Sequence, residues 1–128
     1  MLANGRQEMV KRAVASFYSQ TYAVKQLIIY DNAPIMCDKA DSFDDGILVH
    51  RIWNPMQRSI GALRNAANHM AGNTSADIIA HFDSDDWSGP NRLTEQVALL
   101  EASGADAVGY NEALFWQDAS VVGRREIL

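Results

Sequence analysis

The sequence predicts an α/β domain with a mostly parallel sheet flanked by helices. Amphipathic segments and short apolar runs follow one another in the order helix, strand, strand, helix, strand, helix, strand. Such alternation is typical of a parallel sheet with helices packed on its faces. One apolar run, residues 78–82, leads directly into the acidic cluster Asp83, Asp85 and Asp86. Because open α/β sheets bind ligands at the carboxyl ends of their strands, this cluster is a candidate functional site.

The first half of the chain supplies one predicted helix and two predicted strands. Residues 7–20 carry apolar side chains three and four positions apart, which predicts an amphipathic helix. The apolar runs 26–30 and 47–52 predict buried strands. The acidic stretch 35–46 between them is expected to be a solvated loop.

The next elements continue the same pattern. A second helix is predicted to turn four apolar residues inward: Ile60, Leu63, Ala67 and Met70. Residues 78–82 are expected to form a buried strand, and 90–102 a third helix that begins with proline. A fourth strand is expected at 107–110, followed by a hairpin of 113–116 and 121–122.

Length, charge and cysteine content narrow the class of protein. The 128 residues predict one domain, 1–128, and the net charge of −5 without a basic cluster argues against nucleic-acid binding. The single cysteine, Cys37, cannot form an internal disulfide, which indicates a reducing compartment. No apolar run approaches the ~20 residues that a membrane-spanning helix needs. We therefore expect a soluble, cytoplasmic protein without a transmembrane segment.

The acidic cluster admits several interpretations. A calcium loop of the EF-hand type fails, because its fifth, sixth and twelfth positions would be Trp87, Ser88 and Thr94. A nucleophilic aspartate of the phosphatase type usually follows the first strand of a sheet, and a helix cap would explain one carboxylate rather than three. Neighbouring carboxylates repel one another unless a cation or hydrogen-bond donors hold them. We therefore favour a divalent cation that bridges the aspartates to a diphosphate.

Six segments of the chain resemble, in order and spacing, motifs of the family 2 glycosyltransferases. They are MLANGR (1–6), SQTY (19–22), QLIIYDN (26–32), GALRNAA (61–67), ADIIAHFDSDDW (76–87) and PNRL (90–93). The resemblance implies a GT-A (Rossmann-like) fold with a shortened first strand and without the C-terminal acceptor half. It also implies the inverting transfer of a sugar from a nucleotide donor.

The same resemblance implies a nucleotide-sugar site. Asp83 and Asp85 match the DxD motif that holds Mn²⁺ or Mg²⁺ against the diphosphate. Asp31 matches an acid that accepts a hydrogen bond from uracil, which makes a UDP-sugar the expected donor. The implied nucleotide-binding set is Ala3, Asp31, Asn32, Arg64 and Asp83.

Asn32 stands where the family usually has a second acid. We expect Asp86 and His81 to support the metal ligands from behind, with Asp86 alternatively capping the third helix. In the family, the catalytic base lies beyond the last residue of this chain. Glu112, which follows a predicted strand, is the candidate base that the chain itself offers.

Two classes of function remain open. The first is a glycosyltransferase-like domain that binds a nucleotide-sugar and, alone, transfers little or no sugar. The second is a non-catalytic binding or assembly module. Exposed strand edges would favour the formation of a homodimer by such a module. A nucleotidyltransferase would need a glycine-rich phosphate loop near the N-terminus, and residues 3–6 are a poor one.

Overall fold

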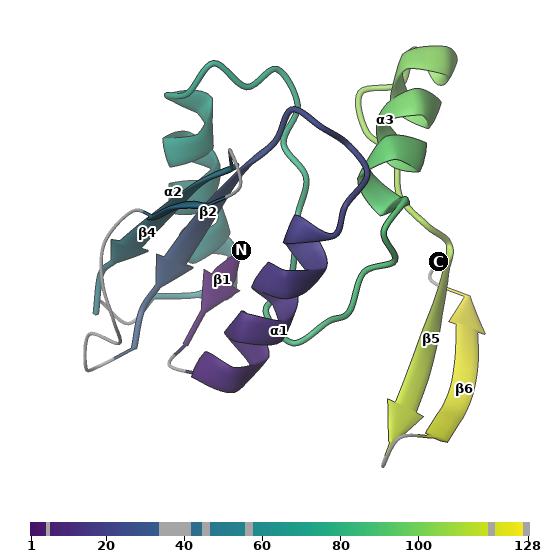
Figure 1. Cartoon of the computed structure of the whole chain (residues 1–128), viewed down its shortest axis with the longest axis horizontal. Coiled ribbons are helices and arrows are strands. Elements are labelled where there is room, and N and C mark those ends of the chain that lie inside the picture. Colours follow the sequence, from purple (N-terminus) through teal and green to yellow (C-terminus); the bar gives the residue numbers. More distant parts are fainter. Residues whose placement is uncertain (5, 34–41, 45–46, 56–57, 118–119, 127–128) are drawn as a thin grey trace. The chain divides into compact units, whose positions relative to one another are not determined.

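The computed structural model describes residues 1–128 except 5, 34–41, 45–46, 56–57, 118–119 and 127–128 (Figure 1). Cys37 and most of the expected loop at 35–46 lie outside the described residues. The chain forms two compact units, Met1–Leu93 and Thr94–Leu128, which are described separately. The prediction of one domain over the whole chain stays a prediction.

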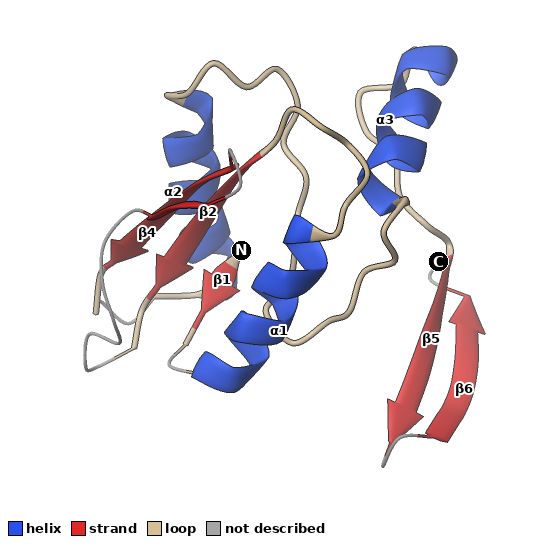
Figure 2. Ribbon diagram, in the orientation of Figure 1, coloured by secondary structure: helices blue, strands red, loops and turns tan. Residues whose placement is uncertain are grey.

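The first unit contains a four-stranded sheet in the order β1-β2-β4-β3. Its strands are β1 (Leu2–Ala3), β2 (Gln26–Asp31), β3 (Ser42–Asp44) and β4 (Ile47–Trp53). β1, β2 and β4 are parallel, and β3 runs antiparallel to β4 (Figure 2). The predicted α/β class with a mostly parallel sheet and a short first strand is therefore confirmed.

β3 corrects the expectation of a solvated loop throughout 35–46. Its residues pair with Ile47, Leu48 and Val49 of β4. The outer edge of β4 presents backbone N–H and C=O groups that need partners. A nearby segment of three residues satisfies them, although its composition does not indicate a strand.

Two helices flank this sheet, α1 (Gln7–Tyr18) and α2 (Ile60–Gly72) (Figure 2). The apolar stripe of α1 packs with β2 and β4 into one core. This core consists of Ala3, Val10, Phe17, Leu27, Ile29, Ile47, Val49, Phe82 and Leu93. On α2 the prediction was partly wrong, because Leu63 is buried but Ile60 and Met70 are exposed at the two ends of the helix.

The expected strand at 78–82 is wrong. These residues are not hydrogen-bonded into a sheet, and Ile78 and Ile79 are exposed. β1 contributes only two residues to the edge of the sheet, so it offers too few backbone groups to pair with a five-residue neighbour. Phe82 alone of this run is buried, in the core beside α1.

The second unit contains most of α3 (Arg92–Ser103) and a hairpin of β5 (Glu112–Gln117) and β6 (Ser120–Glu126). The predicted hairpin is confirmed. α3 is followed directly by Gly104, whose positive φ of 63° suits a residue without a side chain. The strand expected at 107–110 is wrong, because these residues belong to neither sheet. None of the helices in the described ranges is long and apolar enough to cross a bilayer.

Candidate functional site

The acidic loop contains both buried and exposed side chains. Ser84 is buried, whereas the Asp83 and Asp85 side chains on either side of it are 43% and 47% exposed. Phe82 before them and Ser88 after them are also buried. The loop is thus anchored at three points, and it leaves the carboxylates of Asp83 and Asp85 about half exposed.

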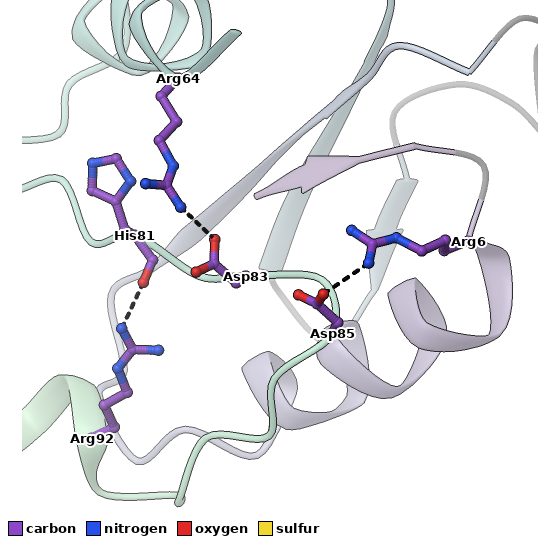
Figure 3. A network of polar contacts seen from close by, with 6 residues as sticks. All are labelled: Arg6, Arg64, His81, Asp83, Asp85 and Arg92. Atoms are coloured by element: carbon purple, nitrogen blue, oxygen red, sulfur yellow. Dashed lines mark hydrogen bonds and ion pairs between the residues drawn. The ribbon is translucent and has the colours of Figure 1, made fainter. Parts of the chain in front are cut away.

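Each of the two carboxylates forms an ion pair with an arginine. Arg64 Nη2 lies 3.2 Å from Asp83 Oδ1, and Arg6 Nη1 lies 2.8 Å from Asp85 Oδ2. Figure 3 shows Arg64 reaching Asp83 from α2, while Arg6 reaches Asp85 from the start of α1. The guanidinium groups therefore compensate the charge of the aspartates from two sides.

Asp86 is in an unfavourable electrostatic environment for a carboxylate. Partial burial of its carboxylate raises its pKa, and the charges of Asp83 and Asp85 raise it further, while Arg92 lowers it. The expectation that Asp86 supports a metal ligand stays a prediction.

Two buried polar side chains, one in α1 and one just after it, fix the end of the acidic loop. Ser16 Oγ donates to the Ser88 carbonyl at 2.8 Å and accepts from the Ser88 N–H at 3.0 Å. Gln20 Nε2 donates to the carbonyls of Ser16 and Gly89 at 3.1 and 2.8 Å. Gln20 Oε1 accepts from the Leu93 N–H at 3.0 Å. These hydrogen bonds hold the backbone after the acidic loop in place without pairing in a sheet.

Arg92 holds the loop from its other side. Its guanidinium donates to the His81 carbonyl at 2.6 Å and to Ser88 Oγ at 2.8 Å, and lies 5.0 Å from the centre of the Phe82 ring. Phe82 in turn makes an edge-to-face contact with Phe17 at 5.7 Å. Both ends of the acidic loop are therefore tied to residues of the first unit.

The carboxyl edge of the sheet carries the residues expected to bind the nucleotide base. Ala3, Asp31 and Trp53 are aligned in register across β1, β2 and β4. Asp31 is 3% exposed, and its Oδ1 accepts from the Ala33 N–H at 3.0 Å. Trp53 Nε1 donates to the Ala33 carbonyl at 3.0 Å, so side chains of β2 and β4 both hold the turn after β2.

The structure brings some of the expected residues together but not all. Asp83, Asp85 and Arg64 lie together in the first unit. Glu112 begins β5 in the second unit and is exposed there. His81 accepts a hydrogen bond from Arg92 through its backbone carbonyl, and its side chain is exposed. In the described ranges, no group of three or more His, Cys, Asp or Glu converges on one point.

Three residues of the site escaped the sequence analysis. Arg6 lies 79 positions from its partner Asp85, a separation that no local pattern reveals. Ser16 and Gln20 left a weak signal, since both are polar residues in or next to the apolar stripe of α1. A polar side chain in such a position needs a hydrogen-bond partner, and this requirement could have pointed to the loop.

Comparison with known proteins identifies the chain. Its sequence matches the model of "Glycosyl transferase family 2" over residues 2–114. The chain belongs to this family. It is also 34% identical over 95 residues to a Bacillus subtilis (strain 168) protein named "Putative glycosyltransferase EpsE".

That alignment covers 70% of this chain and 32% of the Bacillus protein, so the chain spans about a third of this relative. The comparison with solved structures gave no match. The parallel sheet with flanking helices agrees with the GT-A fold of family 2 glycosyltransferases, as the sequence motifs implied.

Proposed function

We propose that this family 2 chain binds the donor of an inverting sugar transfer, a nucleoside-diphosphate sugar, together with Mn²⁺ or Mg²⁺. One observation carries the proposal: Asp83 and Asp85 project from an anchored loop, half exposed, and each is matched by an arginine. A loop that holds two carboxylates outward beside two guanidinium groups suits a ligand that carries both a cation and phosphates.

The donor atoms at the loop fit such a cation only when its diphosphate accompanies it. Mg²⁺ is commonly bound through one or two carboxylates, with substrate phosphates and waters as the other ligands. Asp83 and Asp85 would hold the cation, and in the described residues no third acidic or imidazole ligand joins them. When bound, the cation would act as a Lewis acid on the diphosphate. We therefore expect weak binding of the metal alone.

The protein's own residues would orient the rest of the donor. The family resemblance assigns the base to the edge formed by Ala3, Asp31 and Asn32, and a UDP-sugar is the first candidate. Asp31 is held by the turn that Trp53 supports, so its carboxylate is fixed before any ligand arrives. Arg64, now paired with Asp83, would turn to the diphosphate or the base.

Catalysis by the chain alone is a separate matter. The acceptor hydroxyl must lose a proton during the transfer, which calls for a general base near the sugar. We retain Glu112 as the candidate base. Measuring sugar transfer from a labelled UDP-sugar in Glu112→Gln tests this assignment. Loss of transfer with unchanged UDP binding would support this assignment, and unchanged transfer would end it.

A second candidate function is an assembly module without catalysis. It is favoured by the exposed apolar residues Ile78 and Ile79 and by the two-residue edge strand β1. An apolar segment without a strand partner is suited to pairing with a second copy of the chain. Light scattering that finds a strict monomer would count against it.

Calorimetry with UDP in the presence and absence of Mn²⁺ tests the main proposal. We expect saturable binding that requires Mn²⁺ and falls at least ~10-fold in Asp85→Asn, because a charged ligand interaction is lost. Asp77→Asn is the matched control, since Asp77 is an exposed aspartate outside the loop and the substitution removes the same charge. The absence of detectable binding to any of a panel of nucleoside diphosphates, or equal effects of the two substitutions, would refute the proposal.

A further inference from the structure

We propose that Arg6 is a phosphate ligand that exchanges partners: it neutralises Asp85 in the free protein and moves to the diphosphate when a cation binds Asp85. The inference rests on the proposed function of the loop. Nothing in the sequence motifs assigned Arg6 a role, and its assignment comes from where the fold places it.

Arg6 stands at the junction between β1 and α1. It occupies the position just before the first residue of α1, and its carbonyl accepts the Val10 N–H at 3.0 Å, which fixes its backbone as part of the helix start. Its side chain extends to the acidic loop, where Nη1 lies 2.8 Å from Asp85 Oδ2. The backbone is thus held while the guanidinium remains at the surface.

The charges at the loop point to an exchange. Two arginines face two aspartates, so the group formed by Arg6, Arg64, Asp83 and Asp85 is balanced in the free protein (Figure 3). The charges of a divalent cation and of a diphosphate that carries two negative charges also cancel. When the two groups combine, the cation pairs best with the carboxylates and the guanidinium groups pair best with the phosphates.

The existing ion pair is easy to break. The side chains of Arg6 and Asp85 are each 47% exposed, and exposed pairs of this kind contribute little to stability. The planar guanidinium, in contrast, can form two parallel hydrogen bonds with a phosphate. The exchange therefore gives up a weak, solvated contact for a stronger one to the ligand.

This reasoning predicts effects of opposite sign for one substitution. In Arg6→Ala, Asp85 loses its competing cation, so Mn²⁺ without nucleotide should bind about two- to five-fold more tightly. UDP at saturating Mn²⁺ should bind at least ~10-fold more weakly, because a charged hydrogen-bond donor to the phosphates is lost. A role limited to holding the fold would weaken both.

Lys11→Ala provides the matched control. It removes the same charge from α1, the helix that Arg6 precedes, and breaks an exposed ion pair of similar length, Lys11 Nζ to Glu8 Oε1 at 2.7 Å. Free Mn²⁺ measured by electron paramagnetic resonance gives the first affinity, and calorimetry with UDP gives the second. Lys11→Ala should change both by less than two-fold.

The outcomes separate the two proposals. If the unchanged protein binds UDP with Mn²⁺ but Arg6→Ala binds it equally well, or if Arg6→Ala and Lys11→Ala behave alike, Arg6 has no ligand role and the proposed function stands. Absence of UDP binding by the unchanged protein overturns both. Recovery of most of the UDP affinity in Arg6→Lys would support a role for the positive charge at this position.

Discussion

Replacing Gln20 by leucine removes the side chain that joins the end of α1 to the residues after the acidic loop. The substitution keeps the size of the side chain but leaves no donor or acceptor at a position that is 3% exposed. The carbonyls of Ser16 and Gly89 retain other donors, Ser19 Oγ and the Arg92 N–H. The buried Leu93 N–H loses its partner Oε1.

The loss of stability in Gln20→Leu comes mainly from the Leu93 N–H, which is left without its acceptor. A buried N–H left without a partner costs ~1–3 kcal/mol, and the lost bonds to the two carbonyls add a smaller amount. The apolar surface of leucine offsets part of the loss. We expect the free energy of unfolding to fall by about 2–3 kcal/mol.

Urea unfolding followed by circular dichroism measures this change, with linear extrapolation to water. Gln7→Leu is the control, because Gln7 is exposed at the first position of α1, the helix that precedes Gln20, and its replacement should change stability by less than ~0.5 kcal/mol. A loss below ~1 kcal/mol in Gln20→Leu, or one equal to that of the control, would show that this hydrogen-bond network does not hold the loop.

Further substitutions test the core and the acidic cluster. Phe82→Ala should lower the free energy of unfolding by ~3–5 kcal/mol, because a buried aromatic ring is lost from the core. Ile79→Ala should cost less than ~1 kcal/mol, since Ile79 is 45% exposed, and a larger cost would restore the rejected strand at 78–82. Asp86→Asn should make the protein slightly more stable at neutral pH, because a carboxyl whose pKa is raised by folding opposes the folded state while it is ionised. This gain should disappear as acid protonates Asp86 in the unchanged protein, and a gain that persists in acid would contradict the raised pKa.

The arginine pairs affect how the site is best interpreted. Aspartates tied to arginines in the presence of metal and nucleotide would argue against a metal site. In the free protein the same pairs, Arg6 with Asp85 and Arg64 with Asp83, are an ordinary way to compensate neighbouring carboxylates. The comparison that decides between these interpretations is the position of the arginines with and without Mn²⁺ and UDP.

Local sequence patterns predicted the elements that depend on nearby residues. The spacing of apolar residues located α1, β2, β4 and α2 to within a few positions, because the periodicity of a helix or a buried strand is visible within a short window. The motifs also placed the acidic residues between α2 and α3. The function of these acids followed from resemblance to the family, which the match over residues 2–114 confirms at the level of the family.

Tertiary structure alone decided how the loop is held and what its carboxylates contact. Residues 78–82 have the composition of a strand, but a strand also needs a neighbour of matching length, and β1 has two residues. Ser16, Gln20 and Arg6 meet the loop across roughly 70 to 80 positions of sequence. Contacts over such separations depend on the packing of the whole unit, and for that reason no pattern within a short stretch of the chain specifies them.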